Sequence, residues 1–225
     1  MLTQAIGGLL PTAIGVALSP IPIIAVVLML GTPRARANGP AFVLGWIVGL
    51  AIVGTIVLVA AGSADATQGS QPADWVGVLK IVLGVLVLLV AVRQWRGRPR
   101  AGEQSAMPKW MRAIDTFTPM RSLAIAVALS GINPKNLLLT VGAAAAIAST
   151  GSSTGQEAVA LAVFVLIGTL GVGAPVVIYF ALGQRATRIL DELKTWMAAN
   201  NGAIMAVLCL VIGAKLIGDG ISGLA

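Results

Sequence analysis

Long apolar stretches alternate with short polar segments along the whole chain. A membrane-spanning helix needs about 20 predominantly apolar residues, and each stretch is long enough to form one. The pattern therefore predicts an all-α integral membrane protein with six spans, at residues 5–30, 40–62, 74–95, 122–148, 157–182 and 202–222. The first, fourth and fifth of these are long enough to be tilted or broken.

The composition supports a membrane protein. Hydrophobic residues make up 57% of the 225 residues and charged residues only 10%. Soluble domains carry about 25% charged residues, so this composition excludes an ordinary soluble domain. The mean hydropathy of +0.95 agrees with that exclusion.

The basic residues predict the orientation of the spans. Twelve of the fifteen Lys and Arg residues lie in the segments after the first, third and fifth spans. The opposite loops, 63–73 and 149–156, carry none. Because cytoplasmic loops are enriched in Lys and Arg, we expect both termini outside the cytoplasm. The same placement explains the net charge of +7 without a nucleic-acid partner.

An internal repeat divides the chain into two halves. Residues 13–19 read AIGVALS and residues 124–130 read AIAVALS, which are identical at six of seven positions. The expected organisation is one three-span repeat at 1–98 and a second at 122–225. A basic cytoplasmic linker with a short interfacial helix, residues 99–121, joins them. Since three is an odd number, the second repeat enters the membrane from the opposite face, as in many secondary transporters.

Both copies of the repeat run into a proline-containing break, so helices 1 and 4 are expected to be broken. Proline removes one N–H donor and clashes with the carbonyl four residues earlier, which for Pro20 is the carbonyl of Val16. Each break also resembles a helix restart, because an N-cap residue precedes a proline. A restarted helix presents N–H groups and partial positive charge to an anion. The candidate substrate-binding residues are therefore Ser19, Pro20, Pro22, Ser130, Asn133, Pro134, Lys135 and Asn136.

Three lysines lie within the predicted spans. Lys135 falls in the middle of the fourth, where a charge costs about 2.5–3.5 kcal/mol on insertion scales. It requires a hydrated cavity, loss of its proton or a partner on another span. Lys215 and Asp219 are four residues apart in span 6, so they either pair with each other or offer Asp219 to Lys135 for pairing or proton coupling. Lys80, near the outer end of span 3, is expected to extend toward the membrane surface.

Several chemistries lack the residues they need. Cys209 is the single cysteine, which excludes an intrachain disulfide, and the chain has no histidine. No phosphate-binding G-x-x-x-x-G-K-[ST] motif is present. The eight acidic residues are scattered, whereas metal or acid–base catalysis on lipids usually requires clustered carboxylates. We therefore expect a transporter and not an enzyme, with no cofactor and no metal site.

The chain resembles the lysine-exporter superfamily, and within it the branch of GAP-family or sulfolipid-addressing proteins. The likeness rests on the broken first span at Ser19, Pro20 and Pro22 and on the run Gly131-Ile132-Asn133-Pro134-Lys135-Asn136-Leu137. Two further segments fit, Arg93-Gln94-Trp95-Arg96 and Gly213-Ala214-Lys215-Leu216-Ile217. The resemblance implies an exporter in the cytoplasmic membrane. A related branch carries electrons from thiols with a cysteine pair, which this chain lacks.

Three functional hypotheses follow. The resemblance and the predicted anion site favour export of an envelope glycolipid or another anionic or polar-headed lipid by alternating access. The first alternative is efflux of an amino acid or another small solute. The second is an accessory subunit of an envelope-lipid assembly complex that does not itself transport. The expected partners are the bilayer and the substrate, with a homodimer or the lipid-synthesis machinery as further candidates.

Overall fold

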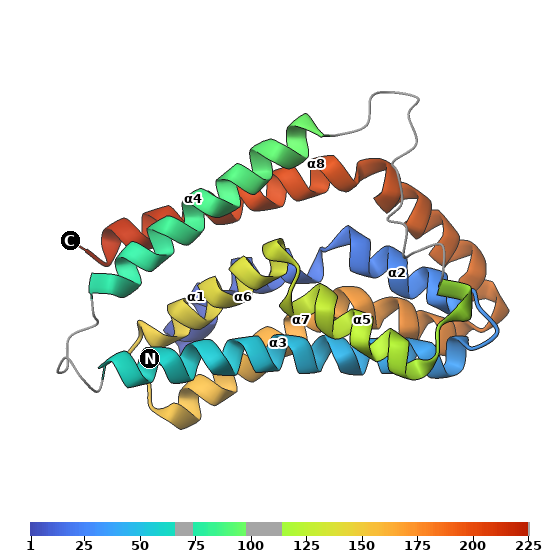
Figure 1. Cartoon of the computed structure of the whole chain (residues 1–225), viewed down its shortest axis with the longest axis horizontal. Helices are drawn as coiled ribbons and strands as arrows, with labels where there is room; N and C mark the ends of the chain where they lie inside the picture. The colour runs from blue at the N-terminus through green and yellow to red at the C-terminus, as the bar shows by residue number, and fades with distance from the viewer. Residues whose placement is uncertain (66–73, 98–113, 225) are drawn as a thin grey trace.

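A computed structural model describes residues 1–65, 74–97 and 114–224. Within these ranges the chain is helical and contains no strand, which confirms the all-α class (Figure 1). The helices are α1 (Leu2–Ala17), α2 (Pro20–Leu30), α3 (Ala35–Asp65), α4 (Asp74–Arg96), α5 (Pro119–Gly131), α6 (Pro134–Ala148), α7 (Thr154–Leu182) and α8 (Gln184–Ser222). Most of the predicted linker, 99–121, falls outside the described residues.

The helices agree with a protein that crosses the membrane several times. Four of them contain segments that are long and apolar enough to span by themselves: Ala35–Ala61, Gly77–Arg96, Thr154–Leu182 and Arg185–Ser222. The other four form two bent pairs: α1 and α2 meet at 49°, and α5 and α6 meet at 62°. By length and composition the described residues therefore have four candidate spans, or up to six if each bent pair counts as one.

Each bent pair breaks where the sequence predicts a break. α2 begins at Pro20 directly after Ser19, and α6 begins at Pro134 directly after Asn133. A proline at the first helical position loses no intrahelical bond, whereas the same residue further inside would. Pro11 and Pro175, in contrast, lie inside continuous helices. At the second break the Asn133 side chain caps α6, whereas the Ser19 side chain makes no capping hydrogen bond to α2, so only the proline at the first helical position is common to both breaks.

α8 is longer than the sequence suggests. The segment between the predicted fifth and sixth spans, 183–201, is almost entirely the first part of this 39-residue helix. Figure 1 shows that α8 changes direction along its length and then runs beside α4. The helix continues because the segment contains no proline, and the pairs Arg188–Glu192 and Lys194–Asp191 stabilise successive turns.

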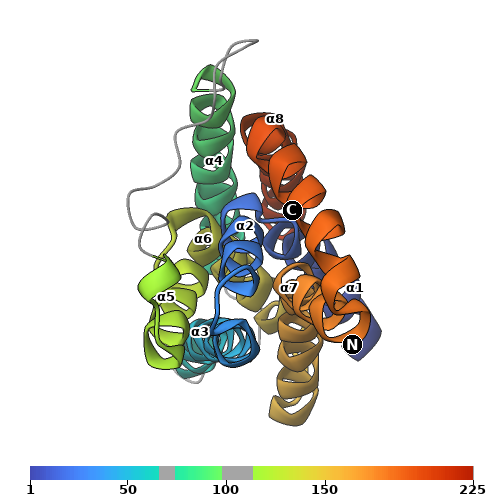
Figure 2. The same cartoon turned by 90° about the vertical axis from the view of Figure 1, so that its right-hand side faces the viewer.

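The helices of the two halves interleave. α3 packs along α5, α1 packs against both α6 and α7, and α4 packs along α8 (Figures 1 and 2). Two glycine pairs bring α4 and α8 together. A Cβ on Gly84 would lie 2.8 Å from the carbonyl oxygen of Gly213, and a Cβ on Gly220 would lie 2.7 Å from that of Gly77. Small residues allow such close approach between membrane helices.

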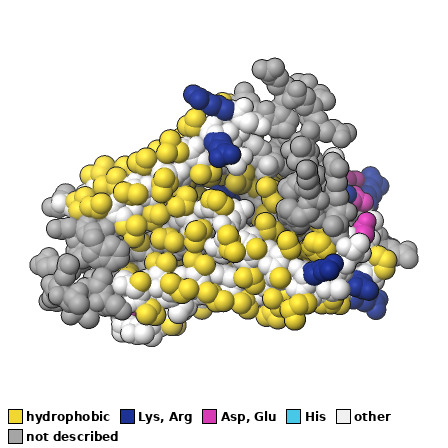
Figure 3. All heavy atoms as spheres, viewed as in Figure 1, with side chains coloured by type: hydrophobic (Ala, Val, Ile, Leu, Met, Phe, Trp, Pro, Cys, Tyr) yellow, Lys and Arg dark blue, Asp and Glu magenta, His cyan; other side chains and the backbone are white. Residues whose placement is uncertain are grey.

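The outer surface is suited to lipid. Apolar side chains are spread over the described part of the face seen in Figure 3, and the charged side chains on it lie at the upper middle and at the right-hand end. Large side chains such as Ile56, Leu166 and Val177 are more than half exposed in the middle of the long helices. A soluble surface rarely carries so extensive an apolar area, whereas contact with acyl chains requires it.

Candidate functional site

Lys135 is buried at the point where the two broken helices meet. It lies in the first turn of α6, and only 4% of the residue is exposed. Its Nζ donates to the carbonyl oxygen of Gly15 at 2.7 Å and to the Ser19 Oγ at 2.6 Å. The lysine thus connects the start of α6 to the end of α1 and to the N-cap of α2. The sequence left open a hydrated cavity, loss of the proton or a partner on another span for Lys135. The structure shows partners on the other broken span, and these are neutral oxygens.

Two asparagines complete the polar cluster. The Ser19 hydroxyl accepts from Lys135 and donates to the Asn136 Oδ1 at 3.0 Å. The Asn133 Oδ1 caps α6 by accepting from the backbone N–H of Lys135 at 3.1 Å. We call Ser19, Asn133, Lys135 and Asn136, with the Gly15 carbonyl, the Lys135 site. The hydrogen bonds of Ser19, Lys135 and Asn136 thus link the two breaks in one network.

The carbonyl that the first break leaves without an N–H donor is not that of Val16, which the position of Pro20 predicts. The Val16 carbonyl, expected to lose its donor, accepts from the Ser19 N–H at 3.2 Å because the last turn of α1 tightens. This leaves the Gly15 carbonyl, four residues before Ser19, for the Lys135 ammonium. The second break repeats the arrangement, since the Leu129 carbonyl, four residues before Asn133, accepts from the Asn136 Nδ2 at 2.9 Å. Side chains of α6 therefore bind the released carbonyl at both breaks.

A narrow cavity adjoins the Lys135 site. It is lined by residues of the two restarted helices and by Met205 of α8, and it leaves about 20 Å³ for the centre of a water molecule. A space of this size holds roughly one water and no lipid head group. Six of the eight predicted residues line it: Ser19, Pro20, Pro22, Asn133, Lys135 and Asn136. The Lys135 site as it stands therefore has no room for a lipid head group.

Ser130 does not join the cluster. Its hydroxyl donates to the carbonyl oxygen of Val127 on the same helix at 3.2 Å, and its side chain lies against Gly49 of α3. The two serines that match in the repeat thus have different roles. The second break has three more residues between the serine and the proline, so Asn133 takes the position that Ser19 has in the first. Pro134 supplies the first helical position of α6.

The charge of Lys135 has no carboxylate partner among the described residues. The ion pairs there are Arg188–Glu192, Lys194–Asp191 and Lys215–Asp219. An ammonium has three N–H donors, and oxygens of the protein take two of those on Lys135. The N-termini of α2 and α6 add partial positive charge at the same place. The arrangement favours an anion or an electron-rich oxygen as ligand.

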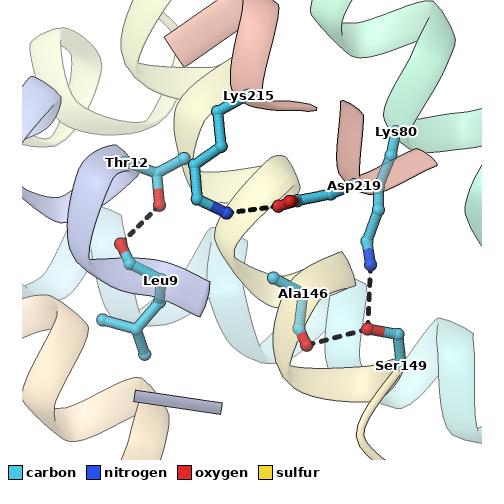
Figure 4. Close-up of polar contacts among 7 residues, drawn as sticks. All are labelled: Leu9, Thr12, Lys80, Ala146, Ser149, Lys215 and Asp219. Carbon is cyan, nitrogen blue, oxygen red and sulfur yellow. Dashed lines mark hydrogen bonds and ion pairs between the residues drawn. The ribbon is translucent and has the colours of Figure 1, made fainter. Parts of the chain in front are cut away.

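The remaining predicted residues form a second cluster, at the far ends of α1, α6 and α8 (Figure 4). Asp219 pairs with Lys215 and not with Lys135. Lys80, expected to extend toward the membrane surface, is instead 8% exposed and donates to the Ser149 Oγ at 2.9 Å. The sequence did not reveal Ser149, because it stands at the edge of a loop where serine is common.

Fold and site together define a multi-pass helical membrane protein with a buried cationic site between two broken helices. The family model of Sap, sulfolipid-1-addressing protein, matches residues 9–222, and the chain belongs to this family. Membership implies a role in sulfolipid addressing. Comparisons with curated proteins and with solved structures returned no match.

Proposed function

We propose that this protein is a secondary-type transporter that exports an envelope lipid with an anionic or polar head group. One observation carries the proposal: the ammonium of Lys135 is buried between two broken helices, and its partners among the described residues are neutral oxygens. Intramembrane cations are costly and usually mark a substrate or ion pathway. Membership of the sulfolipid-addressing family supports a lipid as the transported substrate.

In the proposed cycle, the head group replaces the Gly15 carbonyl and the Ser19 hydroxyl as partners of Lys135. The two helix N-termini then add N–H donors to the same anion. Such an exchange requires the narrow cavity to widen, because it has room for only about one water. Widening first to one side of the membrane and then to the other gives alternating access.

The packing supports a particular moving part. Rigid rocking of the first three spans against the last three would separate α3 from α5 and α1 from α6 and α7. We propose instead that the third spans of the two halves, α4 and α8, move together as one packed pair over the other six helices. This division keeps the close α4–α8 contact intact. The inverted repeat remains part of the proposal, with α1–α2 and α5–α6 as equivalent broken spans.

We place the inner ends of the spans at Arg34, Arg36, Arg121, Arg185 and Arg188, which puts both termini outside the cytoplasm. In this orientation the two helix breaks lie nearer to the cytoplasm than the second cluster, which contains Lys80, Lys215 and Asp219. Substrate would then reach the Lys135 site from the inner leaflet and leave past α1, α6 and α8. The cytoplasmic membrane is the proposed location.

The test compares four versions of the host cell: a deletion strain and that strain complemented with wild type, Lys135→Ala or Lys194→Ala. Lys194 is the control because it loses the same charge from an exposed ion pair on α8. We expect one anionic envelope lipid to leave the surface on deletion and to return with wild type and Lys194→Ala only. Equal insertion of both variants, measured in membrane fractions, is required.

Two results would redirect the proposal. Normal surface lipids with a small acid retained inside the cell would favour solute efflux. Loss of surface lipid without any lipid movement by the purified protein in liposomes would favour the accessory role. Full activity of Lys135→Ala would reject the assignment of the site.

A further inference from the structure

A second polar cavity lies at the opposite end of the helices that build the Lys135 site. Its volume is about 400 Å³, and the residues that line it include Lys80, Ser149, Thr150, Lys215 and Asp219. Figure 4 shows Lys80 extending from α4 toward Ser149 at the end of α6, with Lys215 and Asp219 together on α8. Cavities of 300–1,000 Å³ are typical of small-ligand sites.

The charges of this cavity do not balance. Lys215 and Asp219 form an ion pair and offset each other. Lys80 is buried and donates to the neutral hydroxyl of Ser149, whose own proton goes to the Ala146 carbonyl oxygen at 3.0 Å. One positive charge is therefore left over among the lining residues. Asp219 is near Lys80 as well, but it is shared with Lys215, so two lysines face one carboxylate. A buried cation whose charge is not fully compensated favours an anion.

We propose that this cavity, which we call the Lys80 site, binds a single anionic group such as a sulfate ester, a phosphate or a carboxylate. The ammonium of Lys80 provides the positive charge that binds the anion, and Ser149 and Thr150 line the same cavity. Lys215 adds a second ammonium that Asp219 holds in position. The Lys80 site combines an excess positive charge with a volume of about 400 Å³, and the Lys135 cavity lacks such a volume.

The two sites lie on one route. Lys135 lies in the first turn of α6, and Ser149 directly follows the last residue of this helix. A separation of about 14 residues at roughly 1.5 Å per residue places the two some 21 Å apart. Between them the helices are closely packed. A Cβ on Gly15 would lie 2.3 Å from the Ile212 Cδ1, and a Cβ on Gly142 would lie 3.3 Å from the Leu216 Cδ2. An anion passes this apolar seam only when α8 moves.

Taken with the proposed function, the Lys80 site is the second station for the head group of the exported lipid. The binding itself does not depend on that function, so it is tested separately. The full-length protein in nanodiscs is titrated with inorganic sulfate, with inorganic phosphate and with a sulfated galactolipid. Every protein in this experiment also carries Lys135→Ala. This substitution removes the charge of the Lys135 site, so the anion binding that is measured reports on the Lys80 site.

Removal of the Lys80 charge should weaken binding. We expect Lys80→Ala to lower the affinity for anions by at least about tenfold, the loss of one charged hydrogen bond. Lys80→Arg should retain most of the affinity, and the control Lys194→Ala should leave it unchanged. Binding by Lys80→Ala as tight as that of the background protein would overturn the proposal.

Asp219→Asn provides a test with the opposite sign. It removes the negative charge and frees the Lys215 ammonium from its ion pair, so anions should bind several-fold more tightly. A merely structural ion pair would predict no gain, and weaker anion binding by this variant would overturn the proposal even if Lys80→Ala failed to fold. Binding of sulfate without binding of the sulfated lipid would reject the lipid station and keep the transport proposal intact.

Discussion

Lys135 donates a hydrogen bond to the main-chain carbonyl of Gly15, 120 residues earlier in the chain, over 2.7 Å. The bond exists because α1 ends in a tightened turn that leaves this carbonyl without its helical N–H partner. A backbone oxygen cannot be removed by substitution, so the lysine always has a partner in this arrangement. To replace them, an anion must bind the Lys135 ammonium more strongly than this carbonyl and the Ser19 hydroxyl do together.

Lys135→Met should abolish transport with little loss of stability. The substitution leaves the Gly15 carbonyl and Ser19 without their donor, which costs about 1–3 kcal/mol. It also removes a buried charge that costs about 2.5–3.5 kcal/mol on insertion scales, so the two effects nearly cancel. Thermal unfolding in detergent and lipid transport in liposomes measure the two quantities. Strong destabilisation together with residual transport would contradict this assignment.

Ser19→Ala and Ser130→Ala should differ although both serines are buried and occupy matching positions of the repeat. Ser19 bridges Lys135 and Asn136, so its loss leaves two buried polar groups with fewer partners and should destabilise the protein by about 1–3 kcal/mol. Ser130 only donates back to its own helix, and its loss should be close to neutral. Equal shifts in the unfolding temperature would argue against the bridging role of Ser19.

Gly213→Ala should separate α4 from α8. The new Cβ would lie 3.0 Å from the Gly84 carbonyl oxygen and 2.8 Å from Leu88, so we expect a loss of about 1–3 kcal/mol. Gly218→Ala is the matched control on the same helix, because nothing lies within 4 Å of its Cβ. That variant should be neutral or more stable by up to about 1 kcal/mol, since alanine favours helix. Unfolding in detergent compares the two.

Single cysteines should report the orientation. Arg34 and Ser153 are both exposed, at opposite ends of the spans, whereas the natural Cys209 is 1% exposed and should give little background. With a membrane-impermeant maleimide on intact cells, Ser153→Cys should react and Arg34→Cys should react only after permeabilisation. The reverse pattern would invert the proposed topology, and labelling of both from outside would contradict the six-span arrangement.

The helical class, the number of apolar segments and the two breaks could be predicted from the sequence, because each depends on local properties. Hydropathy over about 20 residues decides whether a segment can span, and a proline after Ser19 or Asn133 decides where a helix restarts. The sequence also identified Lys135, since a charged residue within an apolar segment is costly to bury whatever the tertiary structure. The continuous α8 was missed, because a polar segment can extend a spanning helix as well as end it.

What the sequence determined was therefore which segments are helical and which of their residues are costly to bury. Only the tertiary structure decided that Lys135 binds the Gly15 carbonyl, that Asp219 pairs with Lys215, and that Lys80 turns inward to Ser149. The physical reason is that a membrane helix is apolar on its lipid face and on its protein face alike, so hydropathy does not say which side packs inward. Small differences in fit, such as the approach of Gly84 to Gly213, select the neighbours, and the neighbours select the partners of each charge.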